Sequence, residues 1–274
     1  MQSVSDEARR NRQRVTLVPT MGYLHAGHAS LIRRARRDGD LIVVSIFVNP
    51  TQFGPGEDFS SYPRDFERDL ELIELSGGDV VFAPSVEEMY PEGFSTEVTV
   101  DGLTENLCGA SRPGHFAGVA TVVTKLFTSC RPDAAVFGQK DAQQALVIRR
   151  MTRDLSLSVE ILVSPTIREA DGLARSSRNV YLSDEDRRRA PVIYHALQTG
   201  SSLIKSGENR RGKVMDRMRQ VLSTEDIDYV EAVSADGLSE NETLKGKVLL
   251  AAAVRFGRAR LIDNVLVSAP ETAG

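Results

Sequence analysis

The sequence is poor in cysteine, in basic excess and in long apolar runs, and each shortage excludes a class of protein. The two cysteines, Cys108 and Cys130, stand in no metal-ligand or CxxC spacing, which indicates structural residues in a reducing compartment. The formal net charge is −4, so the chain lacks the basic field that non-specific nucleic-acid binding requires. The longest apolar runs, residues 41–48 and 248–254, are far shorter than a membrane span. We therefore expect a cytoplasmic protein with no nucleic-acid or membrane partner.

The first 14 residues also lack the apolar core of a secretory signal. They carry four arginines together with Asp6 and Glu7, and this acidic pair argues against a transit peptide. The chain has 274 residues, of which 41% are hydrophobic and 26% charged, which is typical of a folded protein of one or two domains. Composition alone predicts a fold but no function.

Strand-like and helix-like segments alternate in the first half of the chain. Short apolar, β-branched runs occupy residues 15–20, 41–48, 79–83, 134–138 and 158–163. Between them, residues 30–37, 66–75, 118–130 and 143–155 place apolar side chains at three- and four-residue spacing. This pattern predicts an α/β fold with a Rossmann-like, doubly wound parallel sheet, and the polar connection 49–63 becomes a candidate pocket wall.

The pattern changes after residue 163, where a polar segment leads to arginine-rich helical stretches and then to strands near 229–235, 248–254 and 259–267. Helices grouped before strands are typical of a smaller α+β domain. We therefore predict two domains, residues 1–164 and residues 165–274, with the boundary near Ser164.

Two histidines three residues apart follow the first predicted strand, in the segment PTMGYLHAGH. His25 and His28 fall at a helix N-terminus, where free backbone N–H groups and the helix dipole favour a phosphate. Gly22 and Gly27 permit a close backbone approach. Imidazole N–H groups suit charge that builds on a polyphosphate leaving group, so we favour an ATP-handling site over the alternative that the histidines only cap the helix.

Three further segments carry polar side chains beside predicted strands. FGQKDAQQ offers Lys140 for phosphate and Asp141 for ribose, although a helix cap is the alternative for Asp141. DGLARSSRN contains hydroxyl and guanidinium groups that suit phosphates, or else forms a polar interdomain loop. SIFVNPTQF ends in Asn49 and Gln52, which can hydrogen-bond a hydroxylated, carboxylated substrate. SRPGHF reads as a turn.

Taken together, these segments resemble the pantoate-β-alanine ligases of the HxGH nucleotidyltransferase superfamily. The resemblance runs from about residue 15 to residue 264 and also includes YPRDFERD, FAPSVEEMYP and RLIDN. It implies a Rossmann-like nucleotide- and pantoate-binding domain, a smaller C-terminal closing domain and a homodimer. It further implies ATP as co-substrate, Mg²⁺ as cofactor, pantoate and β-alanine as substrates, and a pantoyl adenylate intermediate that yields pantothenate, AMP and pyrophosphate.

The same resemblance implies roles for individual residues. It assigns ATP binding to Met21, Gly22, His25, Gly27, His28, Gly138, Gln139, Lys140, Asp141, Ile167, Arg175, Ser176, Ser177 and Arg178. Catalysis falls to His25, His28, Lys140 and Arg178, with His28 as the acid toward pyrophosphate, and pantoate binding falls to Asn49, Gln52 and Gln144. Asp69 is expected to approach magnesium through water. Arg175 replaces an apolar residue of the family, and either contacts phosphate or faces solvent.

Two alternatives stay open. One is a related nucleotidyltransferase that attaches a nucleotide to a phosphorylated alcohol and stops there. The other is a catalytically silent nucleotide-binding or dimer-scaffold protein, against which the complete set of His25, His28, Lys140 and Arg178 argues.

Overall fold

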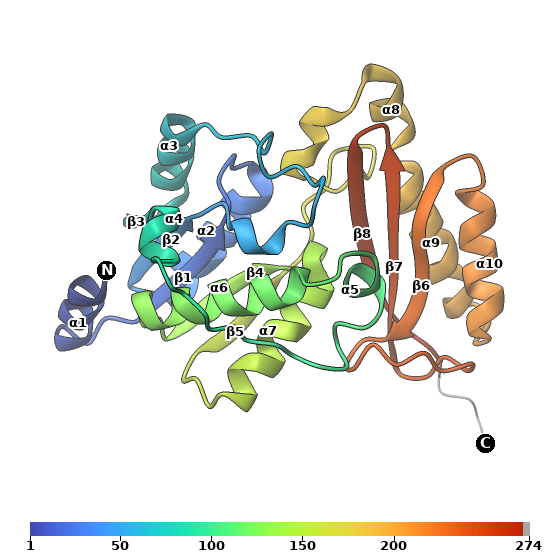
Figure 1. Ribbon diagram of the computed structural model, residues 1–274. Helices are drawn as coiled ribbons and strands as arrows, with labels where there is room; N and C mark the ends of the chain where they lie inside the picture. Colours follow the sequence, from blue (N-terminus) through green and yellow to red (C-terminus); the bar gives the residue numbers. More distant parts are fainter. Residues whose placement is uncertain (271–274) are drawn as a thin grey trace. The chain divides into compact units, whose positions relative to one another are not determined.

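The computed structural model describes residues 1–270, which form two compact units. The first unit comprises residues 1–139 and 144–165, and the second comprises residues 140–143 and the described residues from 166 on. The predicted fold class, a doubly wound parallel sheet with a smaller α+β part, is confirmed (Figure 1). The functional roles that the sequence assigns to residues 1–164 and 165–274 remain predictions.

A five-stranded parallel sheet forms the centre of the first unit. Its strands are β1 (Val15–Thr20), β2 (Leu41–Ile46), β3 (Val80–Phe82), β4 (Ala134–Gly138) and β5 (Glu160–Ser164), in the order β3-β2-β1-β4-β5. β1 pairs in parallel with both β2 and β4, so the direction in which strands are added reverses between β1 and β4. Open α/β sheets bind ligands at the carboxyl ends of the strands at such a switch point.

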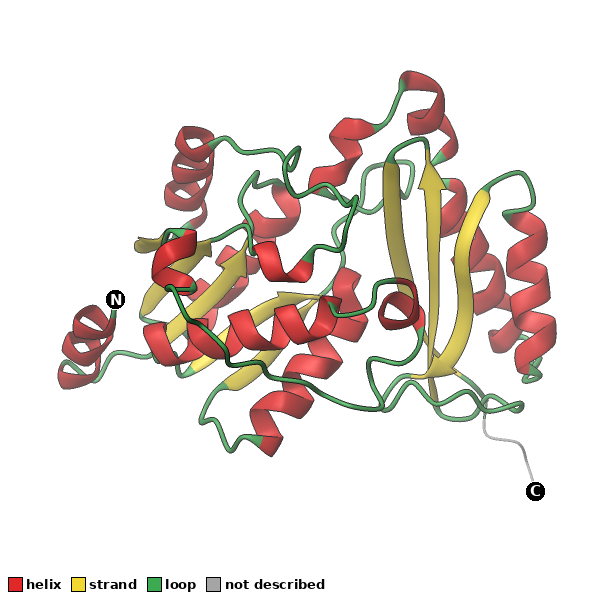
Figure 2. Ribbon diagram, in the orientation of Figure 1, coloured by secondary structure: helices red, strands yellow, loops and turns green. Residues whose placement is uncertain are grey.

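The predicted crossover segments form helices α2 (Ala26–Asp38), α3 (Phe66–Ser76), α6 (His115–Cys130) and α7 (Ala142–Asp154) (Figure 2). The sequence pattern did not predict the short helices α4 (Val86–Met89) and α5 (Leu107–Ser111), or the 3-10 turns η1 (Pro50–Gln52) and η2 (Gln139–Asp141). These elements span too few residues to show a helical period.

The sheet is buried on both faces, as its continuous hydrophobic strands predict. Val18 and Val44 pack with Ile32 of α2 in one apolar cluster. Their sequence neighbours Leu17 and Val43 point to the opposite face and are also 0% exposed. Burial on both faces fixes the strand ends firmly, so the loops that leave them are held at defined positions.

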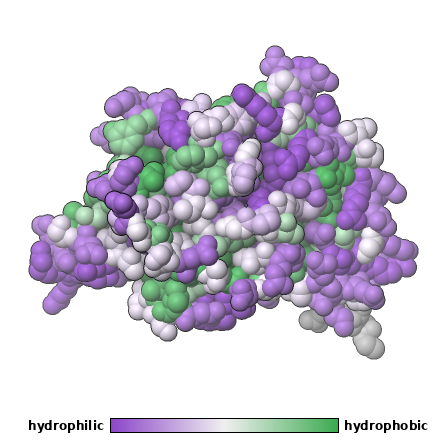
Figure 3. Space-filling model, viewed as in Figure 1, coloured by the Kyte–Doolittle hydropathy of each residue, from purple (hydrophilic) through white to green (hydrophobic). Residues whose placement is uncertain are grey.

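The polar N-terminal stretch forms a helix, α1 (Gln2–Arg10), that the sequence pattern did not predict. Polar contacts attach it to the end of α6. The Ser5 hydroxyl donates to the Cys130 carbonyl, Asp6 pairs with Arg131 at 2.8 Å, and Arg9 donates to the Arg131 carbonyl at 2.9 Å. The surface of α1 in Figure 3 is hydrophilic. Because hydrogen bonds and an ion pair attach α1, its sequence has no apolar stripe from which a helix could be predicted.

The second unit places its helices before its strands, as predicted. After the 3-10 turn η3 (Ser177–Tyr181) come α8 (Asp184–Arg189), α9 (Val192–Lys205) and α10 (Arg211–Val221). Strands β6 (Asp226–Ser234), β7 (Lys247–Phe256) and β8 (Ala259–Ser268) then form an antiparallel sheet in the order β6-β7-β8. Leu197 of α9, Met218 of α10 and Leu250 of β7 share its core. Across residues 1–270, no helix is long and apolar enough to cross a membrane.

Candidate active site

The junction between β1 and α2 is a turn of two left-handed residues, Gly22 at φ +80° and Tyr23 at φ +49°. α2 then begins with His25 as its N-cap. The Gly27 N–H donates to His25 Nδ1 at 3.1 Å, and the His25 N–H donates to His28 Nδ1 at 3.3 Å. The two histidines therefore cap the helix reciprocally, as serine and glutamate do in a capping box.

This capping determines which ring nitrogen carries the proton in each neutral imidazole. A backbone N–H can only donate, so the Nδ1 atoms of His25 and His28 are acceptors and the proton of the neutral ring lies on Nε2. The two half-buried rings lie 4.2 Å apart, centroid to centroid. Each Nδ1 therefore holds the helix start, and the N–H group of each neutral ring lies on Nε2.

Asp69 of α3 anchors the same turn. Its Oδ2 accepts the Tyr23 N–H at 2.8 Å, and its Oδ1 accepts the Leu24 N–H at 2.6 Å. The side chain is 1% exposed, and burial raises the pKa of its carboxyl although the two backbone hydrogen bonds oppose that rise. Each Asp69 oxygen accepts one backbone N–H and keeps a second lone pair, so the predicted contact with a magnesium-bound water stays a prediction.

Asn49 and Gln52 lie together at the end of β2. The Asn49 amide nitrogen donates to Gln52 Oε1 and to the Gly118 carbonyl, each at 3.1 Å, and its oxygen accepts from the Tyr90 hydroxyl at 2.7 Å. Asn49 is 1% exposed. Gln52 Nε2 in turn contacts the Met21 sulfur at 3.1 Å. The structure thus brings together Met21, which follows β1, and Gln52 of η1, which follows β2, and the buried Asn49 side chain hydrogen-bonds Gln52.

The SRPGHF segment, interpreted from sequence as a turn, clamps the backbone of Gln52. His115 Nδ1 lies 2.8 Å from the Gln52 carbonyl, and an Arg112 nitrogen lies 3.3 Å from the same oxygen. Arg112 also pairs with Glu57 in the 49–63 connection at 2.5 Å. Burial alone would raise the pKa of the Glu57 carboxyl, but the hydrogen bonds and charge of Arg112 lower it overall. The sequence showed these residue types but not their common target.

A cavity of about 310 Å³ opens beside the β1–α2 turn, within the first unit. Met21, Gly22 and Asp69 contribute to its wall, together with residues that follow β2 and β3. Most of that wall is apolar, including Phe59 and Phe66. The cavity therefore extends the candidate site along the carboxyl edge of the sheet.

The β4–α7 connection carries the second group of predicted residues. A Cβ added to Gly138, at the end of β4, would meet nothing within 4 Å, so its backbone can be approached closely. Gln139, Lys140 and Asp141 form η2, and the Lys140 ammonium lies 3.8 Å from Asp141 Oδ1. Gln144 follows in α7 and belongs by its contacts to the first unit, whereas residues 140–143 belong to the second.

The DGLARSSRN segment forms a turn closed by an antiparallel bridge between Arg168 and Ala174. The Arg175 N–H donates to the Ile167 carbonyl at 2.9 Å, and the Arg175 side chain pairs with Glu169 at 2.9 Å. Arg175 thus has a carboxylate partner, an alternative that the sequence analysis did not include. Its predicted ATP contact stays a prediction.

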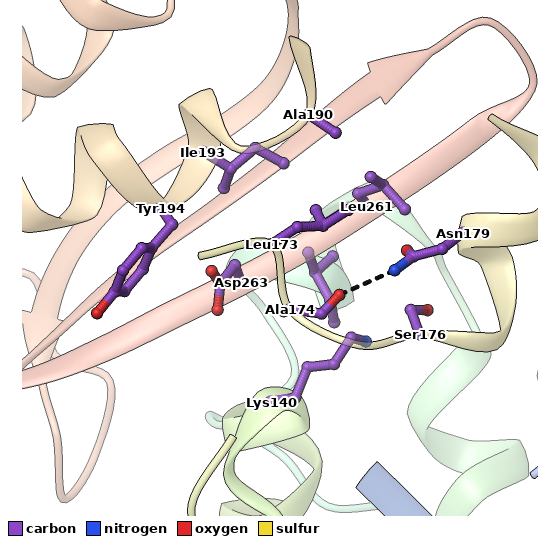
Figure 4. Close-up of a pocket in the computed structure, with 11 residues that line it drawn as sticks. Lys140, Leu173, Ala174, Ser176, Asn179, Ala190, Ile193, Tyr194, Leu261 and Asp263 are labelled. Atoms are coloured by element: carbon purple, nitrogen blue, oxygen red, sulfur yellow. Dashed lines mark hydrogen bonds between the residues drawn. The ribbon is translucent and has the colours of Figure 1, made fainter. Parts of the chain in front are cut away.

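η3 begins directly after this turn. The Ser176 hydroxyl caps it by accepting the Arg178 N–H at 3.3 Å, and Ser177 is its first residue. Lys140, Ser176, Asn179 and Asp263 line one small cavity of the second unit (Figure 4). Two segments that the sequence predicted separately for the nucleotide therefore meet inside the second unit.

No group of three or more His, Cys, Asp or Glu side chains is arranged to hold a metal ion among residues 1–270. The cationic and imidazole groups of the site suit phosphates, so a divalent ion bound together with a polyphosphate is the form that fits these residues.

Comparison with known proteins gives the family. The family model for pantoate-beta-alanine ligase matches residues 1–266. A pantothenate synthetase of Acetivibrio thermocellus is 57% identical over 92% of this chain and 91% of its own length. One from Moorella thermoacetica is 58% identical over 95% and 93% of the two chains, respectively.

Solved structures agree. A crystal structure of pantothenate synthetase from Thermus thermophilus superposes with a TM-score of 0.91 at 50% identity, covering 95% of this chain and 96% of that one. A pantoate-beta-alanine ligase from Francisella tularensis, complexed with beta-gamma ATP and beta-alanine, has a TM-score of 0.78 at 32% identity and covers 97% and 95% of the two chains.

A doubly wound sheet with an antiparallel second unit, together with these relatives, defines a carbon-nitrogen ligase of the α/β class. The chain belongs to the pantoate-β-alanine ligase family. The resemblance drawn from the motifs and the prediction that the chain is an enzyme are both confirmed.

Proposed function

We propose that the chain condenses pantoate with β-alanine to form pantothenate, with ATP as co-substrate. The carboxylate of pantoate attacks the α-phosphorus of ATP, which gives pantoyl adenylate and releases pyrophosphate. The amine of β-alanine then attacks the acyl carbon, the amide bond forms and AMP leaves. Family membership supports the overall ligation, and the beta-gamma ATP and beta-alanine complexed with the Francisella relative support ATP and β-alanine as ligands here.

The pair of imidazoles at the start of α2 is the observation that carries this proposal. Their Nδ1 atoms hold the helix N-terminus, so both Nε2–H donors are oriented without loss of freedom when ATP binds. Negative charge grows on the pyrophosphate as the α-phosphorus is attacked, and donors already in place stabilise it. We assign His28 as the acid toward pyrophosphate and His25 as a second donor.

The remaining predicted residues take positions that suit the same reaction. Lys140 and Arg178 supply positive charge for the phosphates, with Ser176 beside Lys140 in one cavity. Gln52, held on both its side chain and its carbonyl, is the best-supported contact for pantoate. Exclusion of water protects the mixed anhydride from hydrolysis, and we assign this to closure by the C-terminal part. Magnesium, when bound with ATP, neutralises phosphate charge.

The experiment measures pyrophosphate and AMP released by the purified protein with ATP and Mg²⁺, adding pantoate and β-alanine singly and then together. AMP is expected only when both are present, and pyrophosphate exchange is expected with pantoate alone. Pyrophosphate exchange without β-alanine-dependent AMP release would instead favour a related nucleotidyltransferase. No turnover under any condition would favour a silent nucleotide-binding protein.

A pair of variants separates the catalytic role of His28 from its capping role. In His28→Asn, a side-chain oxygen can still accept the His25 N–H, but the Nε2–H donor is gone; His28→Ala loses both. Both variants should lower the adenylation rate about 10²–10³-fold, while only His28→Ala should also lose stability. His195→Asn, an exposed position of α9, is the matched control. Wild-type turnover in His28→Asn would refute the assignment.

A further inference from the structure

Two adjacent polar residues of β8, Asp263 and Asn264, are buried in the second unit at 4% and 5% exposure. Buried polar side chains are expensive unless their hydrogen bonds are satisfied, so what these two contact matters for the fold and the site alike. Asn264 contacts the segment that contains Lys140, and Asp263 contacts the turn that precedes Ser176. The proposed function assigns ATP binding to both segments.

Asn264 reaches the segment that carries Lys140. Its side-chain amide donates to the Lys140 carbonyl at 2.8 Å, across 124 residues of sequence. The backbone N–H of Asn264 donates to Asp263 Oδ1 at 2.7 Å, which ties the Asp263 side chain to the backbone of Asn264. Because residues 140–143 belong by their contacts to the second unit, this bond is part of what holds Lys140 there.

Asp263 reaches the turn that precedes Ser176. Its two oxygens accept from the two terminal nitrogens of Arg168 at 2.5 and 2.9 Å, the two-pronged geometry that orients a guanidinium most strictly. Arg168 also donates to the Gly172 carbonyl at 3.0 Å, and its guanidinium carbon lies 3.8 Å from the ring centroid of Tyr194. The turn between Arg168 and Ala174 is thereby fixed to β8.

We propose that Asp263 and Asn264 are positioning residues that hold Lys140 and the Ser176–Arg178 segment at a fixed spacing for the phosphates of one ATP. The cavity shared by Lys140, Ser176 and Asp263 places these groups together (Figure 4). The inference rests on the proposed function, since it takes both segments to contact ATP. Neither Asp263 nor Asn264 touches the nucleotide in this account; they act through Lys140 and Arg168.

The test measures ATP binding directly, by calorimetry with Mg²⁺-ATP in the absence of pantoate, so that it does not depend on ligation. Asn264→Ala removes the hydrogen bond to the Lys140 carbonyl and should weaken ATP binding about tenfold. Asp228→Asn is the control, because it breaks an ion pair with Arg260 on the same sheet, at a position less deeply buried than Asn264. The control should bind ATP as the wild type does.

A double-mutant cycle separates positioning from general loss of stability. If Asn264 acts through Lys140, Asn264→Ala should have little further effect on ATP affinity in a Lys140→Ala background. A merely structural role would give the same loss in both backgrounds, and that result would overturn the proposal. Wild-type affinity in folded Asn264→Ala would overturn it as well.

A second variant tests the other contact and covers the case in which Asn264→Ala does not fold. Arg168→Lys keeps a positive charge against Asp263 but loses the two-pronged geometry. It should weaken ATP binding, and because it acts through the Ser176–Arg178 segment, that loss should nearly vanish in an Arg178→Ala background. Unchanged affinity in Arg168→Lys would refute this half of the proposal. Failure of the proposed ligation alone would appear as normal ATP binding without AMP release.

Discussion

Gly118→Ala is expected to damage pantoate binding far more than it damages the fold. Gly118 lies in α6, where the helix packs against η1, and a Cβ there would stand 2.5 Å from the Thr51 carbonyl oxygen and 2.7 Å from the Gln52 nitrogen. Both are backbone atoms, so no rotamer change relieves the clash. Ordinary contact begins at 3.4 Å, and η1 must therefore move away by about 0.9 Å.

The magnitudes follow from this displacement. Overpacking costs about 1–3 kcal/mol, and alanine in a helix offsets about 0.5–1 kcal/mol of it relative to glycine. The free energy of unfolding should therefore fall only modestly. The displacement, however, breaks the 3.1 Å bond from Asn49 to the Gly118 carbonyl and shifts Gln52. A misplacement of about 1 Å can cost about 100-fold in rate, so we expect kcat/KM for pantoate to fall by about 10–100-fold.

The assay varies pantoate, ATP and β-alanine in turn, each at saturating levels of the other two. The loss should appear in the pantoate dependence, with the KM for ATP nearly unchanged. Gly212→Ala, in α10, is the control, since a Cβ there meets nothing within 4 Å. It should stabilise the protein slightly and leave all three KM values alone. Equal losses for the three substrates, or none, would refute the reasoning.

Two further predictions concern the buried carboxylate of Asp69 and the half-buried carboxylate of Glu57. Asp69→Asn keeps the side-chain volume but leaves one of the two backbone N–H groups without an acceptor. This should cost about 1–3 kcal/mol of stability, measured by urea unfolding, and lower the adenylation rate. Glu67→Gln, at an exposed position of the same helix, should change neither stability nor adenylation. The lowered native pKa of Glu57 means that its contribution to stability is present above the usual carboxyl pKa of about 4.3 and is lost as pH falls through the native value. Glu57→Gln should therefore unfold more easily at pH 7 and show a weaker acid-side decline; a decline equal to that of the wild type would contradict this.

Much of the fold could be predicted from the sequence because the hydrophobic pattern of each strand agrees with its buried position in the sheet. β4 has no polar side chain and the only polar side chains of β1 are two threonines, and each strand ends in a segment with a glycine. α1 was not predicted, because it is held by hydroxyl, carboxylate and guanidinium contacts that leave no apolar period. The same limitation hid the clamp on Gln52, whose parts lie more than 50 residues apart.

The candidate site shows the same division residue by residue. The sequence placed His25 and His28 at a helix start, and the structure has them there as mutual caps. For Asp69 the sequence offered only a carboxylate near the right strand, and a role toward magnesium was inferred from the resemblance. The buried position beneath the Tyr23 turn could not be read from the sequence, because it depends on how α3 packs against the β1–α2 junction.

The sequence by itself determined the family, the strands and the order of the motifs, because hydrophobic period and motif spacing are local properties of the chain. Only the tertiary structure decided which backbone groups each polar side chain holds. Asn264 and Lys140 are 124 residues apart, and their hydrogen bond forms inside the second unit, where the fold brings the two segments together. A hydrogen bond requires its two atoms to come within about 3 Å, and no local pattern in the sequence specifies a distance across so much chain.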